Sequence, residues 1–125
     1  MSNWLARNAK FVSSATLPGR LFDVGTYPAL SLTAERGDTV TGDLYLLPRP
    51  FPILRKLDRY EGIGPGLRKP YEYRRECVDV NLPDGTQQKA WVYVYARSIR
   101  GLRRIPGGDY PWWCRRKQGY CNSRV

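Results

Sequence analysis

The chain has 125 residues, of which 42% are hydrophobic, and it carries a formal net charge of +10. This length and apolar content predict one folded domain and exclude an intrinsically disordered protein. There is no run of about 18 apolar residues, which a transmembrane helix would need. The first ten residues, MSNWLARNAK, also lack the apolar segment of a secretory signal. The sequence therefore predicts a cytoplasmic protein that does not enter a membrane.

Taken in chain order, the first part of the sequence alternates between short apolar stretches and turn residues. It predicts a helix over residues 3–10, strands over 10–17 and 20–24 separated by a bend at Pro18-Gly19, a turn over 25–28, a strand over 29–33, a polar loop over 34–38 and a strand over 39–46. Pro52 suits the first turn of a following helix, which Tyr60-Glu61 closes before Gly62. The stretch GIGPGLRKP over 62–70 is a loop, because it holds three glycines and two prolines.

The clearest local prediction is a hairpin with strands over 73–82 and 87–96. Asp84-Gly85 favours a two-residue turn between them. Both faces are apolar near the middle, which places the hairpin in the centre of a sheet. The expected cross-strand pairs are Val78 with Trp91, Glu76 with Tyr93, and Cys77 with Val92.

After Arg97 the pattern is lost, and the last 28 or so residues are expected to wrap around the domain, with Trp112-Trp113 covering an apolar end. The elements together predict an α+β fold. Its core is a small mixed, mainly antiparallel sheet that closes towards a β-barrel, with short helices packed around it.

The residues available for chemistry are restricted. The chain has no histidine, and its three cysteines, Cys77, Cys114 and Cys121, lack the spacing of a zinc site or a disulfide framework. Mechanisms that use histidine as the base are therefore excluded. A general base has to be a carboxylate, a lysine or a tyrosine. No metal and no cofactor are predicted.

The positive charge suggests that the chain could be a nucleic-acid-binding protein, because clustered Lys and Arg neutralise phosphates. Much of the excess lies in Arg68-Lys69 with Arg74-Arg75, in residues 97–104, and in Arg115-Arg116-Lys117. No helix-turn-helix, zinc-finger or RNP signature accompanies it. A basic protein surface is the favoured interpretation, and a nucleic-acid-binding protein remains an alternative.

Six segments of the chain, in order, carry a resemblance to a known family. They are LPGRLFDVGTYPAL (17–30), TGDLYLL (41–47), LDRYEG (57–62), YRRECVDV (73–80), AWVYVYA (90–96) and RIPGGDY (104–110). This ordered set closely resembles the gamma-glutamylcyclotransferase-like, or AIG2-like, family. The resemblance implies a family domain over residues 1–110, followed by a basic C-terminal tail over 111–125.

The resemblance also implies a small distorted β-barrel and a reaction at its mouth. The α-amine of a γ-glutamyl compound attacks its own γ-carbonyl, which closes 5-oxoproline and expels an amine. This cyclotransfer needs a group that takes one proton and returns another, and a carboxylate can do both. It also needs a pocket that holds the glutamyl chain curled. The implied partner is a small-molecule γ-glutamyl substrate; the oligomeric state is left open.

The resemblance assigns the acid/base role to Glu61 of LDRYEG, against the alternative of a solvated charge at the end of a helix. Burial beside Tyr60 would raise the pKa of such a carboxyl. Tyr27, Pro28 and Tyr73 are the implied substrate contacts, with packing as the alternative for Tyr27.

Three further residues of the matched segments are given structural roles. Asp58 is expected to be a cap or an ion-pair partner of an arginine, and Arg75 to be an ion-pair partner. Asp109 is expected to anchor the tail.

One signature of the family, a Tyr-Gly-Ser/Thr-Leu string that would hold the glutamyl carboxylate on backbone N–H groups, does not occur in the sequence. Compared with a full domain of the family, the sequence is therefore expected to lack about 15 to 20 residues of strand and loop at its start. Loss of a first strand would expose unpaired sheet edges, open the cavity and weaken both stability and activity. Two further functions thus stay open beside the cyclotransferase: a catalytically impaired barrel that binds a small ligand or protein partner, and the nucleic-acid binder.

Overall fold

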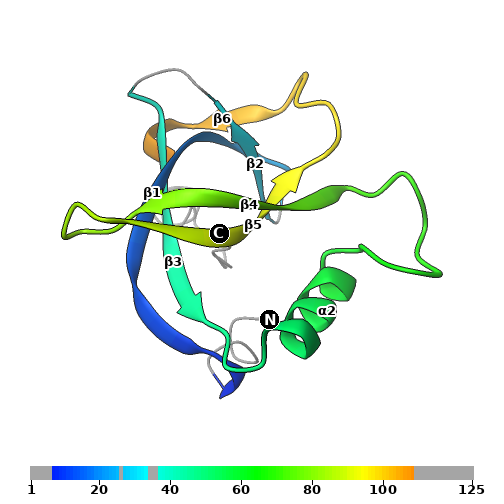
Figure 1. The fold of residues 1–125 in the computed structure, drawn as a ribbon. Coiled ribbons are helices and arrows are strands. Elements are labelled where there is room, and N and C mark those ends of the chain that lie inside the picture. The colour runs from blue at the N-terminus through cyan, green and yellow to red at the C-terminus, as the bar shows by residue number, and fades with distance from the viewer. Residues whose placement is uncertain (1–6, 26, 34–36, 109–125) are drawn as a thin grey trace.

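The computed structural model describes residues 7–25, 27–33 and 37–108 of the chain (Figure 1). In this part the strands pair antiparallel throughout and a single long helix lies to one side. The elements are β1 (Lys10–Asp23), β2 (Pro28–Leu32), β3 (Thr39–Leu46), α2 (Pro50–Tyr60), β4 (Tyr73–Asn81), β5 (Gln87–Tyr95), β6 (Arg103–Ile105) and a 3₁₀ turn, η1 (Pro106–Gly108). The predicted α+β class with a mainly antiparallel sheet is confirmed.

The strand β1 organises the sheet, because it has partners along both of its edges. Its first part pairs with β3, from Lys10 with Leu46 to Pro18 with Thr39. Its last part lies between β2 and β6, so that Leu21 is opposite a residue of each. The long curve of β1 in Figure 1 carries the chain from one of these groups of strands to the other.

The predicted bend at Pro18-Gly19 is not an interruption of the strand. β1 runs through it: the pairing with β3 ends at Pro18, and the pairing with β2 begins at Gly19. A Cβ atom on Gly19 would lie 3.1 Å from Leu30 Cδ1 and 3.1 Å from the Ser31 carbonyl oxygen. Glycine therefore allows β2 to approach β1 closely at the change of partner.

The hairpin is confirmed, but its predicted register is wrong by one residue. The last pair before the turn is Asn81 with Gln87, and the loop between them has five residues, not two. Within the loop, the Leu82 N–H donates to the Thr86 carbonyl, and Asp84 Oδ1 accepts hydrogen bonds from the Thr86 N–H and hydroxyl. The observed pairs are Val78 with Ala90, Cys77 with Trp91, and Glu76 with Val92.

This shift decides which side chains of the hairpin lie together. A slip of one residue moves every side chain of a strand to the other face relative to its partner. Tyr93 therefore lies opposite Arg75 instead of Glu76, and both are on the face that meets α2. This register places Arg75 and Tyr93 side by side, so that both contact Asp58 of α2.

The position of the hairpin in the sheet also differs from the prediction. The path β2-β1-β4-β5 ends at β5, and β4 joins β1 only through the pair of Thr16 with Asn81. In the described part of the chain, β3 and β5 each pair along one edge only. The ring of strands is thus not closed, and the expected barrel is an open, strongly curved sheet.

The core lies inside the curve of this sheet. It is formed by small and branched apolar side chains from all six described strands and is the main source of stability. Its buried members are Ala15, Leu17, Leu21, Leu30, Val40, Val80, Val92, Val94 and Ile105.

The short strand β6 was not expected from the sequence. It brings Ile105, which is 1% exposed, against Leu21 of β1. Three residues are too few for a period-2 pattern to be recognised. The predictions for residues 1–6, for Asp109, for Trp112-Trp113 and for Cys114 and Cys121 fall outside the described residues.

Asp38 joins two parts of the chain that are far apart in sequence. Its carboxylate contacts Arg20 at 2.7 Å and Arg104 at 2.9 Å. Hydrogen bonds from these two guanidinium groups lower the pKa of Asp38 below its ordinary value of 3.8. Asp38 thus ties the segment before β3 to β1 and β6.

Because its folded pKa is depressed, Asp38 stabilises the protein above pH 3.8, and this contribution is lost as the pH falls below 3.8 towards the folded pKa. We expect Asp38→Asn to make the free energy of unfolding fall less steeply over that range than in the wild type. Urea unfolding at a series of pH values measures this. Asp79→Asn is the control, because Asp79 pairs with Lys89 within the exposed hairpin. Parallel pH profiles of wild type and Asp38→Asn would contradict the prediction.

Candidate active site

The helix α2 places Glu61 at its C-terminal end. The Glu61 N–H donates to the Leu57 carbonyl at 2.9 Å, so Glu61 continues the helical hydrogen bonding as the C-cap. Gly62 follows with a φ of 79°, which ends the helix as glycine does at this position. Glu61 is only 9% exposed and is the one charged side chain counted as buried in the described part of the chain. The alternative of a solvated helix-end charge therefore does not fit.

Asp58 lies one turn before Glu61 and forms the centre of a polar group with β4 and β5. Its Oδ1 accepts a hydrogen bond of 2.7 Å from the Tyr93 hydroxyl. Arg75 Nε lies 2.9 Å from the same oxygen, close enough for an ion pair but not aligned as a hydrogen bond. The predicted role of Asp58 as an arginine's ion-pair partner is confirmed, and so is that of Arg75.

Tyr93 is the functional candidate that the sequence analysis missed. Burial is the main cause that raises the pKa of Tyr93, followed by its hydrogen bond to Asp58 and the negative charges of Asp58 and Glu61. Tyr93 thus remains a protonated donor near Glu61 and cannot be the general base. The alternation in AWVYVYA contained the signal, but the incorrect register placed Tyr93 opposite the wrong residue.

We expect Tyr93→Phe to lower the free energy of unfolding by about 1 kcal/mol, because the partly buried Asp58 carboxylate loses the hydrogen bond from the Tyr93 hydroxyl. Urea unfolding measures the change. Tyr95→Phe is the matched control, since the Tyr95 hydroxyl has no hydrogen bond within the described residues. Equal losses in the two variants would contradict the role given to the Tyr93 hydroxyl.

The three predicted substrate contacts, Tyr27, Pro28 and Tyr73, lie close together. The rings of Tyr27, Tyr73 and Tyr95 pack against one another and form an aromatic group. The Tyr73 ring lies 5.6 Å from that of Tyr95 and 6.2 Å from that of Tyr27. The Tyr73 hydroxyl donates to the Pro28 carbonyl at 2.9 Å, and Tyr73 is 4% exposed. Tyr73 therefore has a packing role that is independent of any substrate.

Tyr27 is the more accessible member of this aromatic group. Its hydroxyl donates to Glu72 Oε2 at 2.7 Å. Burial, and then the hydrogen bond to Glu72, raise the pKa of Tyr27 to about 12, so the hydroxyl stays protonated at neutral pH. The group connects to Asp58 through β4, because Tyr73 and Arg75 are two residues apart and lie on one face of that strand.

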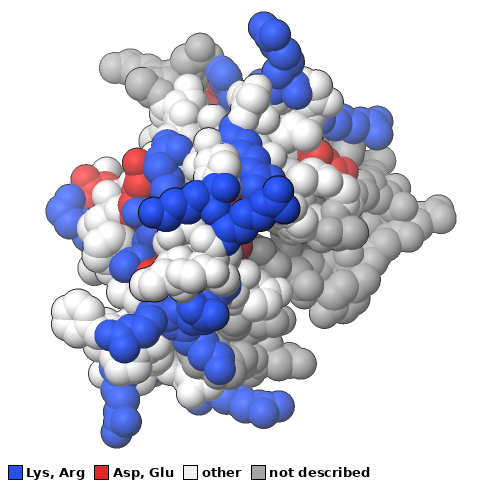
Figure 2. Space-filling model, turned by 90° about the vertical axis from the view of Figure 1, so that its right-hand side faces the viewer, with Lys and Arg blue, Asp and Glu red and all other residues white. Residues whose placement is uncertain are grey.

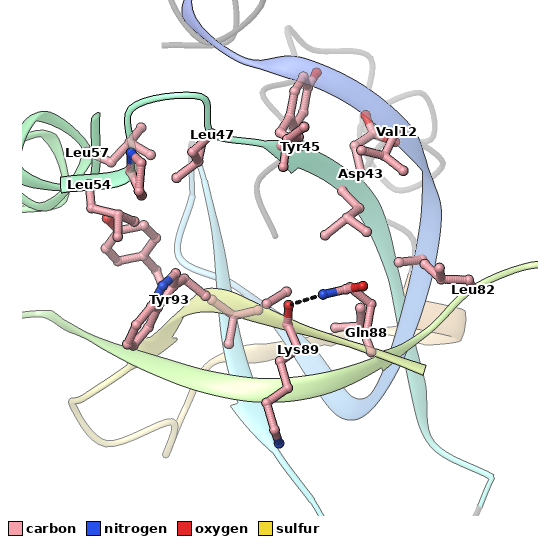
Figure 3. A pocket seen from close by; sticks show the side chains of 18 residues that line it. Val12, Asp43, Tyr45, Leu47, Leu54, Leu57, Leu82, Gln88, Lys89 and Tyr93 are labelled. Atoms are coloured by element: carbon pink, nitrogen blue, oxygen red, sulfur yellow. Dashed lines mark hydrogen bonds between the residues drawn. The ribbon is translucent and has the colours of Figure 1, made fainter. Parts of the chain in front are cut away.

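A cavity of about 410 Å³ lies between α2 and the strands β3 and β5 (Figure 3). Leu54, Leu57 and Tyr93 are grouped at one end of it in Figure 3, and Leu82 lies towards the other. Glu61 is not among its lining residues. Pro50, Leu54 and Leu57 line it along one stripe of α2, and Glu61 is the next position of that stripe. Glu61 thus follows directly on the helical wall of the cavity.

Positive side chains dominate one face of the molecule. Figure 2 shows Lys and Arg spread over the face that looks to the right in Figure 1, with few acidic side chains between them. Arg97 is 3.6 Å from Glu72 on the side of the aromatic group. A face of this charge attracts anionic molecules in general. Within the part of the chain that the structure describes, the helices lack the length and the apolar character of a membrane-spanning segment.

The chain is similar to known proteins over most of its length. A family profile described as "Gamma-glutamyl cyclotransferase, AIG2-like" matches residues 1–113. YtfP of Escherichia coli K12, a gamma-glutamylcyclotransferase family protein, is 29% identical over 110 residues, which cover 87% of this chain and 82% of YtfP. The family protein of the same name from Shigella flexneri shows the same identity and coverage.

Two solved structures share the fold. The solution structure of E. coli YtfP has a TM-score of 0.60 and 28% identity, and the match covers 85% of this chain and 80% of that one. The crystal structure of an uncharacterized Pyrococcus horikoshii protein has a TM-score of 0.59 at 17% identity, covering 93% and 83% of the two chains; at this identity it supports the fold alone. The profile match, the relatives and the shared fold lead to one conclusion: the chain belongs to the gamma-glutamylcyclotransferase-like, AIG2-like family.

Proposed function

We propose that this protein is a gamma-glutamylcyclotransferase in which Glu61 is the general acid/base. The observation that carries the proposal is the burial of Glu61 at the end of α2, next to a cavity and beside a protonated tyrosine. A buried carboxylate can exchange protons with a bound substrate without being solvated by bulk water.

In the proposed reaction Glu61 takes a proton from the α-ammonium of the substrate. The freed amine attacks the γ-carbonyl carbon of the same glutamyl group, which forms the new C–N bond of 5-oxoproline. The bond from that carbon to the leaving nitrogen breaks as Glu61 returns this proton to that nitrogen. The ring nitrogen then loses its second proton, which the released amine takes up to become an ammonium. Holding the two ends of the glutamyl group together makes the attack intramolecular, and this alone accelerates it greatly.

The neighbours of Glu61 position it in this proposal. Tyr93 and Arg75 fix Asp58, and Asp58 lies one turn before Glu61 on α2. The end of the helix is therefore held against β4 and β5. Tyr27, with a hydroxyl that is protonated at neutral pH, is the proposed donor to the substrate, whereas Tyr73 and Pro28 shape the wall next to it.

The test is the release of 5-oxoproline from a set of γ-glutamyl amides, followed by chromatography. We expect release that is proportional to the protein concentration and that needs no added metal. A protein that binds these amides without releasing 5-oxoproline would contradict the proposal. It would support the second candidate, a ligand-binding protein of the same fold, which is favoured by a cavity that does not include Glu61.

A further inference from the structure

The positively charged side of the molecule in Figure 2 is built from three segments that are separate in the sequence. They are the helix α2, the loop over residues 62–72 and the segment over 96–102 after β5, which together form the right-hand side of Figure 1. We call their exposed Lys and Arg side chains the basic face. Its members are Arg55, Lys56, Arg59, Arg68, Lys69, Arg97 and Arg100.

Contacts within the chain hold the three segments side by side. The Tyr71 hydroxyl donates to the Gly64 carbonyl at 2.9 Å, and a Cβ atom on Gly64 would lie 4.0 Å from Arg59 Cγ. Arg97 Nη2 donates to the Pro70 carbonyl at 3.4 Å. The loop is therefore fixed between the end of α2 and the segment after β5. The charges of the basic face thus belong to one continuous surface.

The acidic residues of the same segments do not neutralise this surface. The side chains of Asp58 and Glu72 are only 18% and 25% exposed and are already paired with arginines, and Glu61 is buried. Four members of the basic face have no ion-pair partner within the described residues: Arg55, Arg59, Arg68 and Arg100. Their charge is therefore available to an anionic partner.

The composition of the basic face fits a chain of phosphate groups that carries bases. Arginine predominates in it over lysine, and the planar guanidinium group binds two phosphate oxygens at once. Aromatic rings lie among the charges. Tyr60, which is 43% exposed, follows Arg59, and Lys69 Nζ lies 5.7 Å from the centre of the Tyr71 ring. The bases of a single strand stack on such rings while its phosphates bind the basic groups around them.

A membrane or an acidic protein fits this surface less well. In the loop over 62–72 and the segment over 96–102, the exposed positions hold only Pro, Gly, Ala, Ser and basic residues. Attachment to a membrane would need apolar side chains that enter the lipid. A protein partner would need an apolar centre for the interface. Contacts to a phosphate backbone need neither.

We propose that the basic face binds a single-stranded nucleic acid through its phosphates, as a property separate from the proposed cyclotransfer at Glu61. The three segments contain no Asn or Gln, the side chains that read adenine by paired hydrogen bonds. Binding is therefore expected to depend on charge and stacking, and to show little preference for base sequence.

The first test measures binding of a fluorescent oligouridine strand of about twelve nucleotides, a length within the usual site size, by anisotropy at several salt concentrations. The charge variant is Arg68→Gln/Arg100→Gln. The control is Lys10→Gln/Lys89→Gln, which removes the same charge from β1 and β5. All three proteins keep residues 111–125, so the charge of that tail contributes equally to each.

We expect Arg68→Gln/Arg100→Gln to weaken binding about tenfold or more at about 0.1 M salt, because two phosphate contacts are lost. The plot of log affinity against log salt concentration should become shallower by about 1.4, which is about 0.7 for each contact. Arg55→Gln/Arg59→Gln, on α2, should act similarly, and the control should change the affinity less than about threefold. Equal effects in the control and in both charge variants would overturn the basic face as the site, as would wild-type binding that does not depend on salt.

The second test identifies the class of partner. Duplex RNA of the same length, oligoglutamate of the same charge, and vesicles of phosphatidylcholine with phosphatidylserine are compared with oligouridine as competitors. We expect the single strand to compete best, because only it offers both phosphates and accessible base faces. Equal or better competition by the duplex or by oligoglutamate would overturn the assignment to single strands. Vesicle binding that Arg68→Gln/Arg100→Gln abolishes, without any binding of oligouridine, would overturn it in favour of a membrane surface.

Discussion

Replacement of Glu61 by glutamine is expected to lower kcat for 5-oxoproline release by at least about 100-fold, the usual contribution of a positioned acid/base. Glutamine keeps the size and hydrogen-bonding capacity of the side chain but cannot accept and return a proton. The fold should therefore remain intact, because the C-cap hydrogen bond from Glu61 to Leu57 uses the backbone only. Steady-state assays on a γ-glutamyl amide measure the effect.

Two controls define the meaning of the Glu61→Gln result. Glu76→Gln changes a glutamate on β4 that pairs with Arg74 at the surface, and should leave kcat unchanged. Binding of the substrate to Glu61→Gln, measured by calorimetry, should stay within about threefold of the wild type, since the general acid/base acts mainly in the transition state. A variant that keeps full turnover would exclude Glu61 as the proton-transferring group.

The second large effect is expected at Gly108, in η1. Gly108 is buried and has a φ of 64°, which favours glycine. A Cβ atom there would lie 3.0 Å from the Thr39 carbonyl carbon and from Val40 Cα, and closer still to the Thr39 carbonyl oxygen. These are backbone atoms of β3, which is held by β1, so they cannot move aside easily. Gly108→Ala should lower the free energy of unfolding by about 3 kcal/mol or more.

Gly107 provides a matched control within the same turn. Its φ of 76° is similar, but no atom lies within 4 Å of the position that a Cβ would take. Gly107→Ala should therefore lower the free energy of unfolding by about 1 kcal/mol, which is the cost of the left-handed backbone conformation without a steric contact. Urea unfolding of the two variants separates conformational strain from steric contact. If Gly108→Ala were no less stable than Gly107→Ala, the close packing of η1 on β3 would be contradicted.

The local pattern of the sequence was sufficient for most of the individual elements. β3 was predicted with its observed bounds, and α2 with its end at Tyr60-Glu61, because period and proline or glycine signals coincide there. The hairpin was found from Asp84-Gly85, but its register was not, since the side chain of Asp84 bonds to Thr86 and widens the loop to five residues. Turn residues identify a hairpin more reliably than they fix its register.

In the candidate site, too, one residue was found from the sequence and another depends on long-range packing. Glu61 was identified through the LDRYEG segment and its resemblance to the family, and its burial agrees with the role proposed for it. Tyr93 was missed, because its meeting with Asp58 depends on how α2 packs against β4 and β5. The sequence separation of 35 residues between them leaves no local signal.

The type of most elements, the α+β class, the absence of a histidine base and the carboxylate that the family resemblance selects could all be predicted from the sequence. These properties follow from local periodicity, composition and ordered motifs, which need no knowledge of distant contacts. The hairpin register, the edge position of β5 and the cavity between β3 and β5 could be read only from the folded chain. They depend on which strand edges remain unpaired after the chain has packed, and this is a property of the whole arrangement rather than of any one segment.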